Sequence, residues 1–590
     1  MTYTPPINDI LFVLTRLIGI EKLAALPGYD SVSDDLTRSI LEEAGKLASG
    51  TFAPLNHEGD KQGLKFSNNS VTMPTGFADA YKEYVAGGWN GLSFPESIGG
   101  QGLPATLAMP VQEMLQTANL ALALCTLLNQ GAIELLSQHG TEAQKQKYLP
   151  NMVSGAWTGT MNLTESSAGS DVGAVRCKAI KDGAHYKVQG QKIFISYGEH
   201  DMAENIIHLV LARLPGAPEG TKGLSLFLVP KFLVKDDGTL GARNDAYAIS
   251  IEHKLGQHAS PTCTMSYGDK ENCYAELVGE ENRGIEAMFV MMNNARIGVG
   301  LQGLALCERA MQHAADFARS RVQSKPLKTN AQKGADKPVT IINHPDVRRM
   351  LMSMKAQIEA SRALAYSAAF AIDSEHQERV DLLTPIVKAW ITDLSNELTS
   401  TGVQVFGGMG FIEETGAAQH MRDARVLAIY EGTNGIQAND LVFRKLSKDD
   451  AKAFNAYVAE MHVIAKQCAA EQGDDMAVIA ATLLTSLGHL EKAAAYLLHL
   501  TKSDMNAAAF AAVPFLRLFA VTAGAARMAE AALISTRELQ APQDFSADFL
   551  ESKIITARFY AESILPQTAG LLPVILAKQQ GVITMPESWF

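Results

Sequence analysis

The stretch RDARVLAIYEGTNGIQ, residues 422–437, decides how the chain is interpreted. A continuous apolar run, Val426–Tyr430, ends at a single carboxylate, Glu431, which is followed by Gly432. Apolar surroundings remove water from a carboxylate and raise its pKa toward the range that suits a general base. A neighbouring glycine lets the backbone approach a ligand closely. These residues predict a turn that presents Glu431 as a base.

The size and composition of the chain restrict its class. A chain of 590 residues is too long for one hydrophobic core, and we expect about three or four domains. With 47% hydrophobic and 19% charged residues, the composition is that of an ordinary globular protein. A formal net charge of -12 argues against nucleic acid as a partner, because such a partner needs a large basic face.

The cysteines and the N-terminus bear on the compartment. Six scattered cysteines lack the spacing of metal or redox sites, which suits a reducing compartment. The apolar stretch Ile10–Leu17 is short and contains Arg16, so no signal or transit peptide is expected. We also expect no membrane span, taking no apolar run to be long enough. These features predict a cytoplasmic protein of a bacterium, without a metal site.

The texture of the sequence changes along the chain and divides it into five segments. Short β-branched runs such as Ile206–Leu211 and Leu224–Val229 predict strands, whereas Glu286–Arg321 and Pro345–Ser374 have the spacing of long helices. An insert at about 324–340 predicts an exposed loop. The predicted segments are an N-terminal extension (1–34), a helical N-terminal domain (35–156), a middle β domain (157–282), a helical domain (283–448) and an extra C-terminal helical domain (449–590).

This order of helices, β domain and helices, together with the tetrapeptide Tyr430–Thr433, resembles the acyl-CoA dehydrogenase family. The resemblance implies a mainly α fold, in which a helical N-terminal domain and a C-terminal helical bundle hold FAD and an acyl-CoA, with a middle β-barrel over the flavin. The segments at both ends resemble a larger bacterial subfamily, whose substrates range from long-chain acyl-CoAs to 3-methylthiopropionyl-CoA. A saturated straight-chain acyl-CoA is the favoured substrate, and 3-methylthiopropionyl-CoA is a candidate.

The resemblance also implies a reaction. Glu431 would remove the α-proton of an acyl-CoA while a β-hydrogen leaves as hydride to flavin N5, giving the trans-2-enoyl-CoA. By residue type alone, Arg296 would be an ion-paired helix residue. By family position it lies beside the base and the substrate, with Asn293 and Tyr430 as further substrate contacts.

Two stretches of the β domain are candidates for flavin binding. In WTGTMNLTESSAGSD, residues 157–171, small residues and hydroxyls can orient backbone N–H groups at a polar ligand, although an ordinary Ser/Gly turn fits equally well. In GQKIFIS, residues 190–196, alternation predicts a strand with two side chains on one face, which a half-buried strand would also show. The resemblance implies flavin contacts from the following residues: Met161, Leu163, Thr164, Gly169, Ser170, Phe194 and Ser196.

A third candidate stretch joins Arg321 to the Gly-rich segment Gln404–Gly410. A guanidinium suits pyrophosphate, and a Gly-rich turn allows close backbone approach, although such a turn can also simply end a helix. In the family these segments reach the adenine dinucleotide half of FAD across a subunit interface, which implies a homodimer. The residues carried over are Arg321, Gln404, Gly407, Gly408 and Thr433. The aromatic residue that usually follows the arginine is absent here, where Ser324 begins the insert.

Alternatives remain at this level. An electron-transfer flavoprotein is the expected electron acceptor, but an acyl-CoA oxidase would use the same base and oxygen. A flavoprotein kept for binding or assembly is a third possibility. The group His200, Asp201 and Glu204 predicts a hydrogen-bonded loop rather than a metal site, because no second ligand cluster accompanies it.

Overall fold

The computed structural model describes residues 2–327, 337–577 and 580–590. The chain folds as two compact units. The first contains residues 43–298 and the first few residues of the chain, and the second contains residues 5–42 and 299–590. The unit boundaries fall within two helices, α3 (Asp34–Leu47) and α9 (Gly284–Ser320). The tip of the insert predicted at 324–340 lies outside the described residues. Its two arms are joined by backbone hydrogen bonds: the N–H of Val339 donates to the carbonyl of Ser324, and the N–H of Gln323 donates to the carbonyl of Val339.

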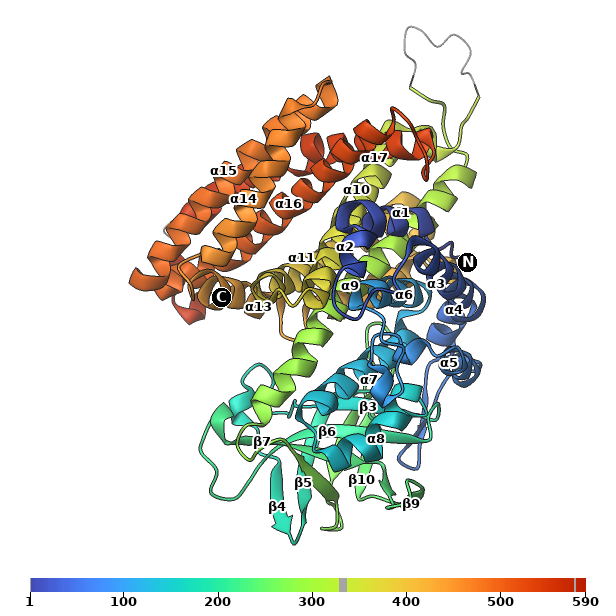
Figure 1. Ribbon diagram of the computed structural model, residues 1–590, viewed down its shortest axis with the longest axis vertical. Coiled ribbons are helices and arrows are strands. Elements are labelled where there is room, and N and C mark those ends of the chain that lie inside the picture. The colour runs from blue at the N-terminus through green and yellow to red at the C-terminus, as the bar shows by residue number, and fades with distance from the viewer. Residues whose placement is uncertain (1, 328–336, 578–579) are drawn as a thin grey trace. The chain divides into compact units, whose positions relative to one another are not determined.

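The helices of the first unit precede its main strands. They are α4 (Ala53–Gln62), α5 (Phe77–Ala86), α6 (Ala105–Ala118), α7 (Leu120–His139) and α8 (Glu142–Ser154), with a hairpin of β1 (Lys65–Ser67) and β2 (Ser70–Thr72) between α4 and α5. The side chain of Asn119 accepts the N–H of Leu122 at 3.1 Å and so caps α7, which separates it from α6. Helices α7 and α8 pack against the first long strand of the unit, β3 (Trp157–Asn162) (Figure 1).

The expectation that no apolar run reaches membrane-spanning length is wrong. By length and composition alone, α7 and a helix of the second unit, α16 (Met505–Glu538), could each span a membrane. Of their most apolar windows, however, 83% and 67% of the residues are buried inside the protein. A helix that is buried on most sides becomes apolar all round, so burial in the protein accounts for both runs.

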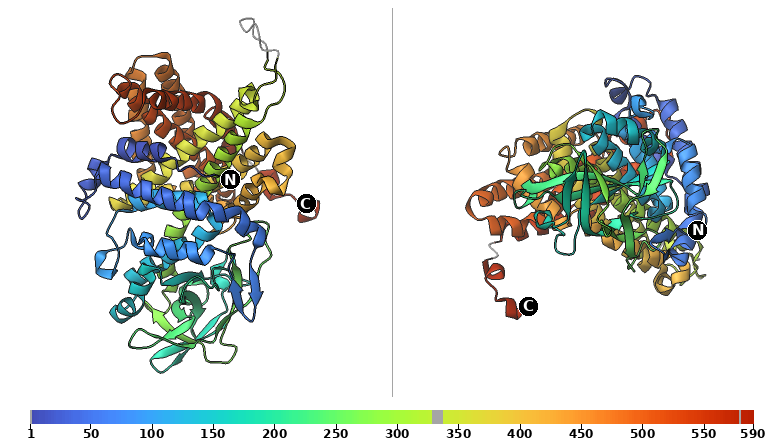
Figure 2. Two further views of the ribbon diagram at one scale, coloured as in Figure 1. Left: turned by 90° about the vertical axis from the view of Figure 1, so that its right-hand side faces the viewer. Right: turned by 90° about the horizontal axis from the view of Figure 1, so that it is seen from below.

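The strands confirm the predicted β domain. Besides β3 they are β4 (Lys178–Asp182), β5 (His185–Ser196), β6 (Asn205–Arg213), β7 (Leu224–Pro230), β8 (Phe232–Val234), β9 (Leu240–Arg243), β10 (Ala246–Ile251), β11 (Thr262–Tyr267) and β12 (Tyr274–Val278). Eight of them form one sheet in the order β10-β11-β5-β12-β7-β6-β3, and β4 pairs with both β5 and β6. That pairing closes β5, β12, β7, β6 and β4 into a ring, the barrel that was expected. The strands gather in one block in both views of Figure 2.

The second unit is helical. Its main helices after α9 are α10 (Pro345–Asp373), α11 (Gln377–Phe406), α12 (Ala417–Ala424), α13 (Asn434–Asp440), α14 (Lys452–Ala470), α15 (Asp474–Ser503), α16, α17 (Ala547–Phe559), α18 (Gln567–Leu576) and α19 (Gln580–Ile583). Helices α14, α15 and α16 pack side by side (Figure 1). Glycines let α9 and α11 approach closely: a Cβ at Gly300 or Gly303 would collide with the backbone oxygen of Val387 or Ile391.

The N-terminal extension is built into this helical unit. It forms α1 (Ile7–Phe12), a π-helical turn (Val13–Ile18) and α2 (Ile20–Ala24). The π-helical turn packs against α10 and α16. Apolar side chains such as Ile10 and Leu14 are fully buried, so the extension supplies part of a core.

A buried ion network fastens the extension. Lys553 of α17, only 3% exposed, binds Asp9 of α1 and lies 3.1 Å from Glu359 of α10. Glu359 is also 2.5 Å from Lys355. Burial is the largest single influence on Asp9 and would raise its pKa, but Lys553, Lys355 and Arg362 together outweigh burial and hold that pKa well below its usual range. One ammonium thus joins the first helix of the chain to one of the last.

Candidate active site

The turn that carries Glu431 has an unusual backbone. Glu431 has a φ of 55° and Gly432 a φ of 81°, so two consecutive residues lie in the left-handed region. For a non-glycine residue this conformation costs about 1–3 kcal/mol and persists only where the surrounding structure enforces it. The side chain of Glu431 is half-buried. A strained, partly buried carboxylate on a turn is the arrangement that the sequence predicts for a base.

Side chains from α11 and α13 hold this turn. The ammonium of Lys388, fully buried on α11, donates to the carbonyl oxygen of Gly432 and to Oδ1 of Asn434, both at 2.8 Å. Asn434 Nδ2 in turn donates to Asp393 at 2.6 Å and to Thr392 Oγ1 at 2.9 Å. Burial raises the pKa of Asp393. The turn is therefore attached to α11 by a chain of buried hydrogen bonds.

Two glutamines surround the turn from other helices. The hydroxyl of Tyr430 donates to Oε1 of Gln302 on α9, and Gln437 Nε2 on α13 donates to the carbonyl of Glu431 at 3.4 Å. Both glutamine side chains are fully buried. The turn residues predicted for the site, Tyr430, Glu431 and Thr433, thus have polar neighbours within the second unit, with Thr433 as the N-cap of α13.

The predicted substrate residues of the first unit contact each other. Arg296 and Asn293 lie one turn apart on α9, and Arg296 Nη1 donates to Asn293 Oδ1 at 3.2 Å. The guanidinium also lies 6.0 Å from the ring centre of Phe289. Asn293 is exposed and Arg296 is half-buried, which leaves donor groups of both at the protein surface.

The first predicted flavin stretch forms a strand and a tight turn. Met161 is the last residue but one of β3, and Leu163 and Thr164 follow the strand; all three are half-buried. Reciprocal backbone hydrogen bonds join Glu165 and Ala168, so Ser166 and Ser167 form the tip of the turn. The buried carboxylate of Glu165 accepts the N–H groups of Arg176 and Cys177 and the ammonium of Lys192, at 2.7–2.9 Å. This anchor leaves Gly169 and Ser170 exposed.

The second predicted stretch departs from regular alternation. Lys192 and Phe194 would share a face in a regular strand, yet Lys192 is fully buried and Phe194 is 60% exposed. A bulge explains this difference, because two residues of β5 oppose one residue of β11 at this point and Phe194 has a φ of 60°. Ser196 remains half-buried, on the expected side with Phe194. The bulge turns a large aromatic side chain toward solvent.

The predicted adenine-side residues come together in the second unit. The rings of Phe317 on α9 and Phe406 on α11 stack with centres 4.2 Å apart, and they join the ends of these two helices. Arg321 follows α9, and Gln404, Gly407 and Gly408 lie at the end of α11. All four are exposed, and a Cβ at either glycine would meet no atom within 4 Å.

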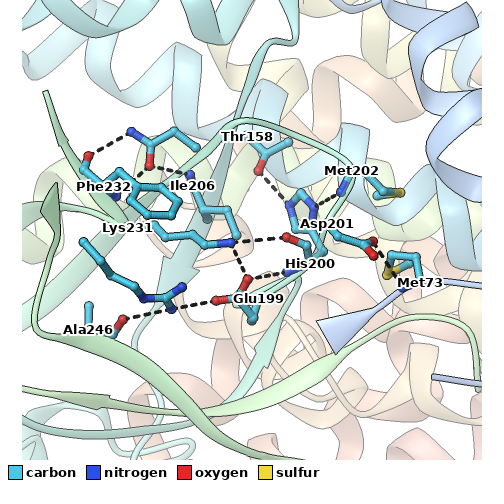
Figure 3. A network of polar contacts seen from close by, with 12 residues as sticks. Met73, Thr158, Glu199, His200, Asp201, Met202, Ile206, Lys231, Phe232 and Ala246 are labelled. Atoms are coloured by element: carbon cyan, nitrogen blue, oxygen red, sulfur yellow. Dashed lines mark hydrogen bonds and ion pairs between the residues drawn. The ribbon is translucent and has the colours of Figure 1, made fainter. Parts of the chain in front are cut away.

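The loop around His200 forms the predicted hydrogen-bond network (Figure 3). His200 Nε2 lies 2.9 Å from Thr158 Oγ1, and its Nδ1 accepts the N–H of Met202. Asp201 accepts the N–H of Met73 at 3.2 Å. Beside them, buried Glu199 binds Lys231 and Arg243. Within the described residues no group of three His, Cys, Asp or Glu side chains could hold a metal ion.

We expect two buried histidines to make the fold sensitive to acid. Burial, reinforced by Lys231, lowers the pKa of His200 and His208 to about 3, against 6.5 in a model peptide. Below pH 6.5 the unfolded chain therefore binds protons that the native state refuses, and stability falls until about pH 3. The expected loss at pH 5 is about 2 kcal/mol for each histidine. Urea unfolding at pH 7.5 and pH 5.0 measures it. In a His200→Gln variant the loss between these two pH values should shrink by about that amount, and an unchanged loss would contradict the assignment.

Sequence reasoning missed the residues that hold the turn. Lys388 is a single charge inside the apolar run Ile386–Ile391, and a lone lysine in a buried helix must find partners. The sequence therefore indicated that Lys388 is buried and paired. It did not indicate the partner, the carbonyl of Gly432, because a backbone acceptor has no signature in composition or spacing.

Comparison with known proteins gives the family. The family models described as "Acyl-CoA dehydrogenase, N-terminal domain", "middle domain" and "C-terminal domain" match residues 35–156, 160–269 and 282–446. A fourth model, "Acetyl-CoA dehydrogenase C-terminal like", matches residues 457–586.

Individual relatives cover the whole chain. A 3-methylmercaptopropionyl-CoA dehydrogenase of Ruegeria pomeroyi is 43% identical over 581 residues, 97% of each chain. A butyryl-CoA dehydrogenase of Syntrophomonas wolfei is 34% identical over 100% of this chain and 99% of its own. The structure of Caenorhabditis elegans ACDH-11 in complex with C11-CoA covers 98% of this chain and 96% of its own, with a TM-score of 0.74 and 20% identity, and shows the same fold.

The chain order of helices, a small β-barrel and further helices matches the N-terminal, middle and C-terminal domains of the acyl-CoA dehydrogenases. The chain belongs to the acyl-CoA dehydrogenase family. The predicted fold, the oxidoreductase class and the acyl-CoA substrate class are confirmed at this level, and FAD is the cofactor of the family.

The residues present fit FAD. An exposed aromatic side chain, Phe194, can cover a ring face, and an exposed guanidinium, Arg321, can pair with a pyrophosphate. At Gly169 and Gly408 the protein leaves open space where a side chain would start, so a ligand can approach the backbone there. Gly407 has a φ of 60°, a conformation that favours glycine in any case.

Proposed function

We propose that Glu431 is the base of an acyl-CoA dehydrogenase reaction and removes the α-proton of the acyl thioester. The observation that carries this proposal is the left-handed backbone of a half-buried glutamate, held by buried side chains on a turn. When bound, FAD supplies the hydride acceptor for the β-hydrogen. In this proposal the backbone N–H of Glu431 is one donor to the thioester oxygen, which must be stabilised as negative charge develops.

The remaining predicted residues take supporting roles in this proposal. Arg296, Asn293 and Tyr430 bind the substrate. The flavin is held by the exposed and half-buried set in the first unit, which comprises Met161, Leu163, Thr164, Gly169, Ser170, Phe194 and Ser196. On the adenine side it is held by Arg321, Gln404, Gly407 and Gly408, with Thr433 beside the base.

We further propose a cytoplasmic homodimer that passes electrons to an electron-transfer flavoprotein. Exposed apolar side chains at the Gly-rich turn and beside it support the dimer, because such a patch favours a protein partner: Met409, Phe411, Ile412, Met421 and Ile429. Sedimentation at micromolar concentration tests the dimer, and a monomer would refute it. Peroxide formed in air at the rate of substrate turnover would instead identify an oxidase.

The experiment that tests the function is an anaerobic titration of the FAD-loaded protein. Saturated acyl-CoAs of graded length and 3-methylthiopropionyl-CoA, which is the substrate named for the Ruegeria relative under its synonym, are added while flavin absorbance is followed. We expect at least one thioester to bleach the flavin, and the order of rates ranks the substrates. A bound yellow flavin that no thioester bleaches would point to a binding or assembly role.

A further inference from the structure

The turn after Glu431 is bound by a lysine that has no part in the proposed reaction. The carbonyl of Gly432 and the side chain of Asn434 meet the same buried ammonium, that of Lys388. These residues lie on both sides of Thr433, directly after the strained Glu431. A single cation thus contacts the turn at two points, within three residues of the proposed base.

A buried ammonium in this place needs a structural reason. Lys388 is fully buried, and removing a charge from water costs several kcal/mol unless hydrogen bonds and opposite charge compensate for it. The amide of Asn434 provides a link: its oxygen accepts from Lys388 and its nitrogen donates to Asp393. The amide of Asn434, on α13, thus bridges two groups of α11: the ammonium of Lys388 and the carboxyl group of Asp393.

Helix α9 closes this arrangement from the other side. Gly300 and Gly303 bring α9 against the backbone of α11 at Val387 and Ile391, the residues on either side of Lys388. Close packing at these points keeps water away from the ammonium. Hydrogen bonds are stronger and more directional in such a low-dielectric setting. The turn is therefore fixed to a rigid helix rather than to solvent.

We propose that Lys388 and Asn434 are positioning residues that hold the Glu431 turn in its left-handed conformation and so place the carboxylate for proton removal. This inference rests on the proposed role of Glu431 as the base. The carbonyl of Gly432 fixes the orientation of the peptide after it, and Asn434 fixes the start of α13. Without these bonds the strain at Glu431 would be relieved by rotation of the turn.

The first test replaces Lys388 by Met, whose unbranched side chain is one atom shorter and carries no charge. Flavin reduction is followed anaerobically in the FAD-loaded protein, per bound flavin, with the thioester that bleaches the wild type fastest. We expect the reduction rate at saturating substrate to fall about 10- to 100-fold, because a displacement of about 1 Å has effects of this size. The apparent Kd of the thioester should change less than the rate.

A double-variant cycle separates this inference from the proposed function. In a Glu431→Gln background Lys388→Met should cause no further loss, since it acts through the carboxylate. An equal loss in both backgrounds would overturn the inference. If Glu431→Gln alone retained near-full turnover, the proposed function would fail first. A severe loss from Glu431→Gln with no loss from Lys388→Met would leave the function standing and refute the positioning role.

A milder pair of variants covers the case in which Lys388→Met does not fold. Thr392 and Thr399 are both fully buried on α11, and both hydroxyls donate to a backbone carbonyl four residues earlier. Of these two, only Thr392 also accepts a hydrogen bond from Asn434 Nδ2, at 2.9 Å. Thr392→Val should lower the reduction rate about two- to fivefold, corresponding to the loss of one hydrogen bond, whereas Thr399→Val should leave it unchanged. Equal rates in these two variants would contradict the proposal.

Hydrogen exchange provides a readout that does not depend on turnover. Backbone amides of residues 430–437 should exchange faster in Lys388→Met and Thr392→Val than in the wild type, while Thr399→Val retains the wild-type pattern. Unchanged exchange in Lys388→Met would show that the turn is fixed by other contacts and would overturn the proposal.

Discussion

Replacing Glu431 by Gln is expected to lower the rate of flavin reduction by an acyl-CoA roughly 10²- to 10⁴-fold or more. The amide keeps the size of the carboxylate and can still accept hydrogen bonds, but it cannot take up the α-proton. Because the turn is held through backbone and Asn434 contacts, the substitution should leave its conformation intact. Anaerobic stopped-flow absorbance of the FAD-loaded variant measures the effect.

The matched control is Glu414→Gln. Glu414 is exposed and lies beside the Gly-rich turn, where no role is expected for it. Its substitution makes the same change of charge at a distance in sequence of less than twenty residues. A rate within about twofold of the wild type is expected for it, as for most surface substitutions. Glu431→Gln with near-wild-type turnover would refute the assignment of the base.

The largest expected effect on stability comes from Lys553→Met. This change leaves the carboxylates of Asp9 and Glu359 in a buried site without their shared cation. Breaking a buried ion network in this way costs about 3–5 kcal/mol. We expect a lower urea midpoint for the helical unit, and earlier cleavage of residues 5–24 by a protease. The proteolysis identifies which part of the unit is released.

An exposed ion pair serves as the comparison for that experiment. Lys502 lies 2.8 Å from Asp450, with both side chains more than two-thirds exposed. Such pairs contribute about 0–1 kcal/mol, because water screens them. Lys502→Met should therefore leave the urea midpoint almost unchanged. If the two lysine variants unfold at the same urea concentration, the buried network does not fasten the extension.

The order of elements followed from local sequence patterns. The first strand of the main sheet begins at Trp157, where the strand texture of the sequence also begins. The helices from Glu286 and from Pro345 were placed within two residues of their ends, because apolar spacing is a local property. The bulge at Phe194 was not predicted. It depends on how β11 pairs with β5, and the alternation of β5 alone carries no information on its partner.

For the candidate site, the sequence suggested which residues lie on the turn, but not the buried side chains that hydrogen-bond to it. Tyr430, Glu431 and Thr433 lie on one turn, and Arg296 donates a hydrogen bond to Asn293, a contact that the sequence did not predict. The buried partners of the turn come from α9 and α11, which are more than forty residues away for Lys388 and more than a hundred for Gln302. Contacts at such separations depend on how the helices pack, here on the glycines of α9. A single sequence does not allow that packing to be predicted.

The place of the extension has a consequence for synthesis. Asp9 and its partner Lys553 are 544 residues apart, so the first helix leaves the ribosome long before the helix that neutralises it. At about 5–20 residues per second the wait is roughly half a minute to two minutes. Until α17 is made, Phe12 lacks its contact with Phe549, although α10, against which residues 13–18 pack, has already been synthesised. Nascent chains stopped before residue 553 should therefore keep the first helix open to proteases and available to chaperones.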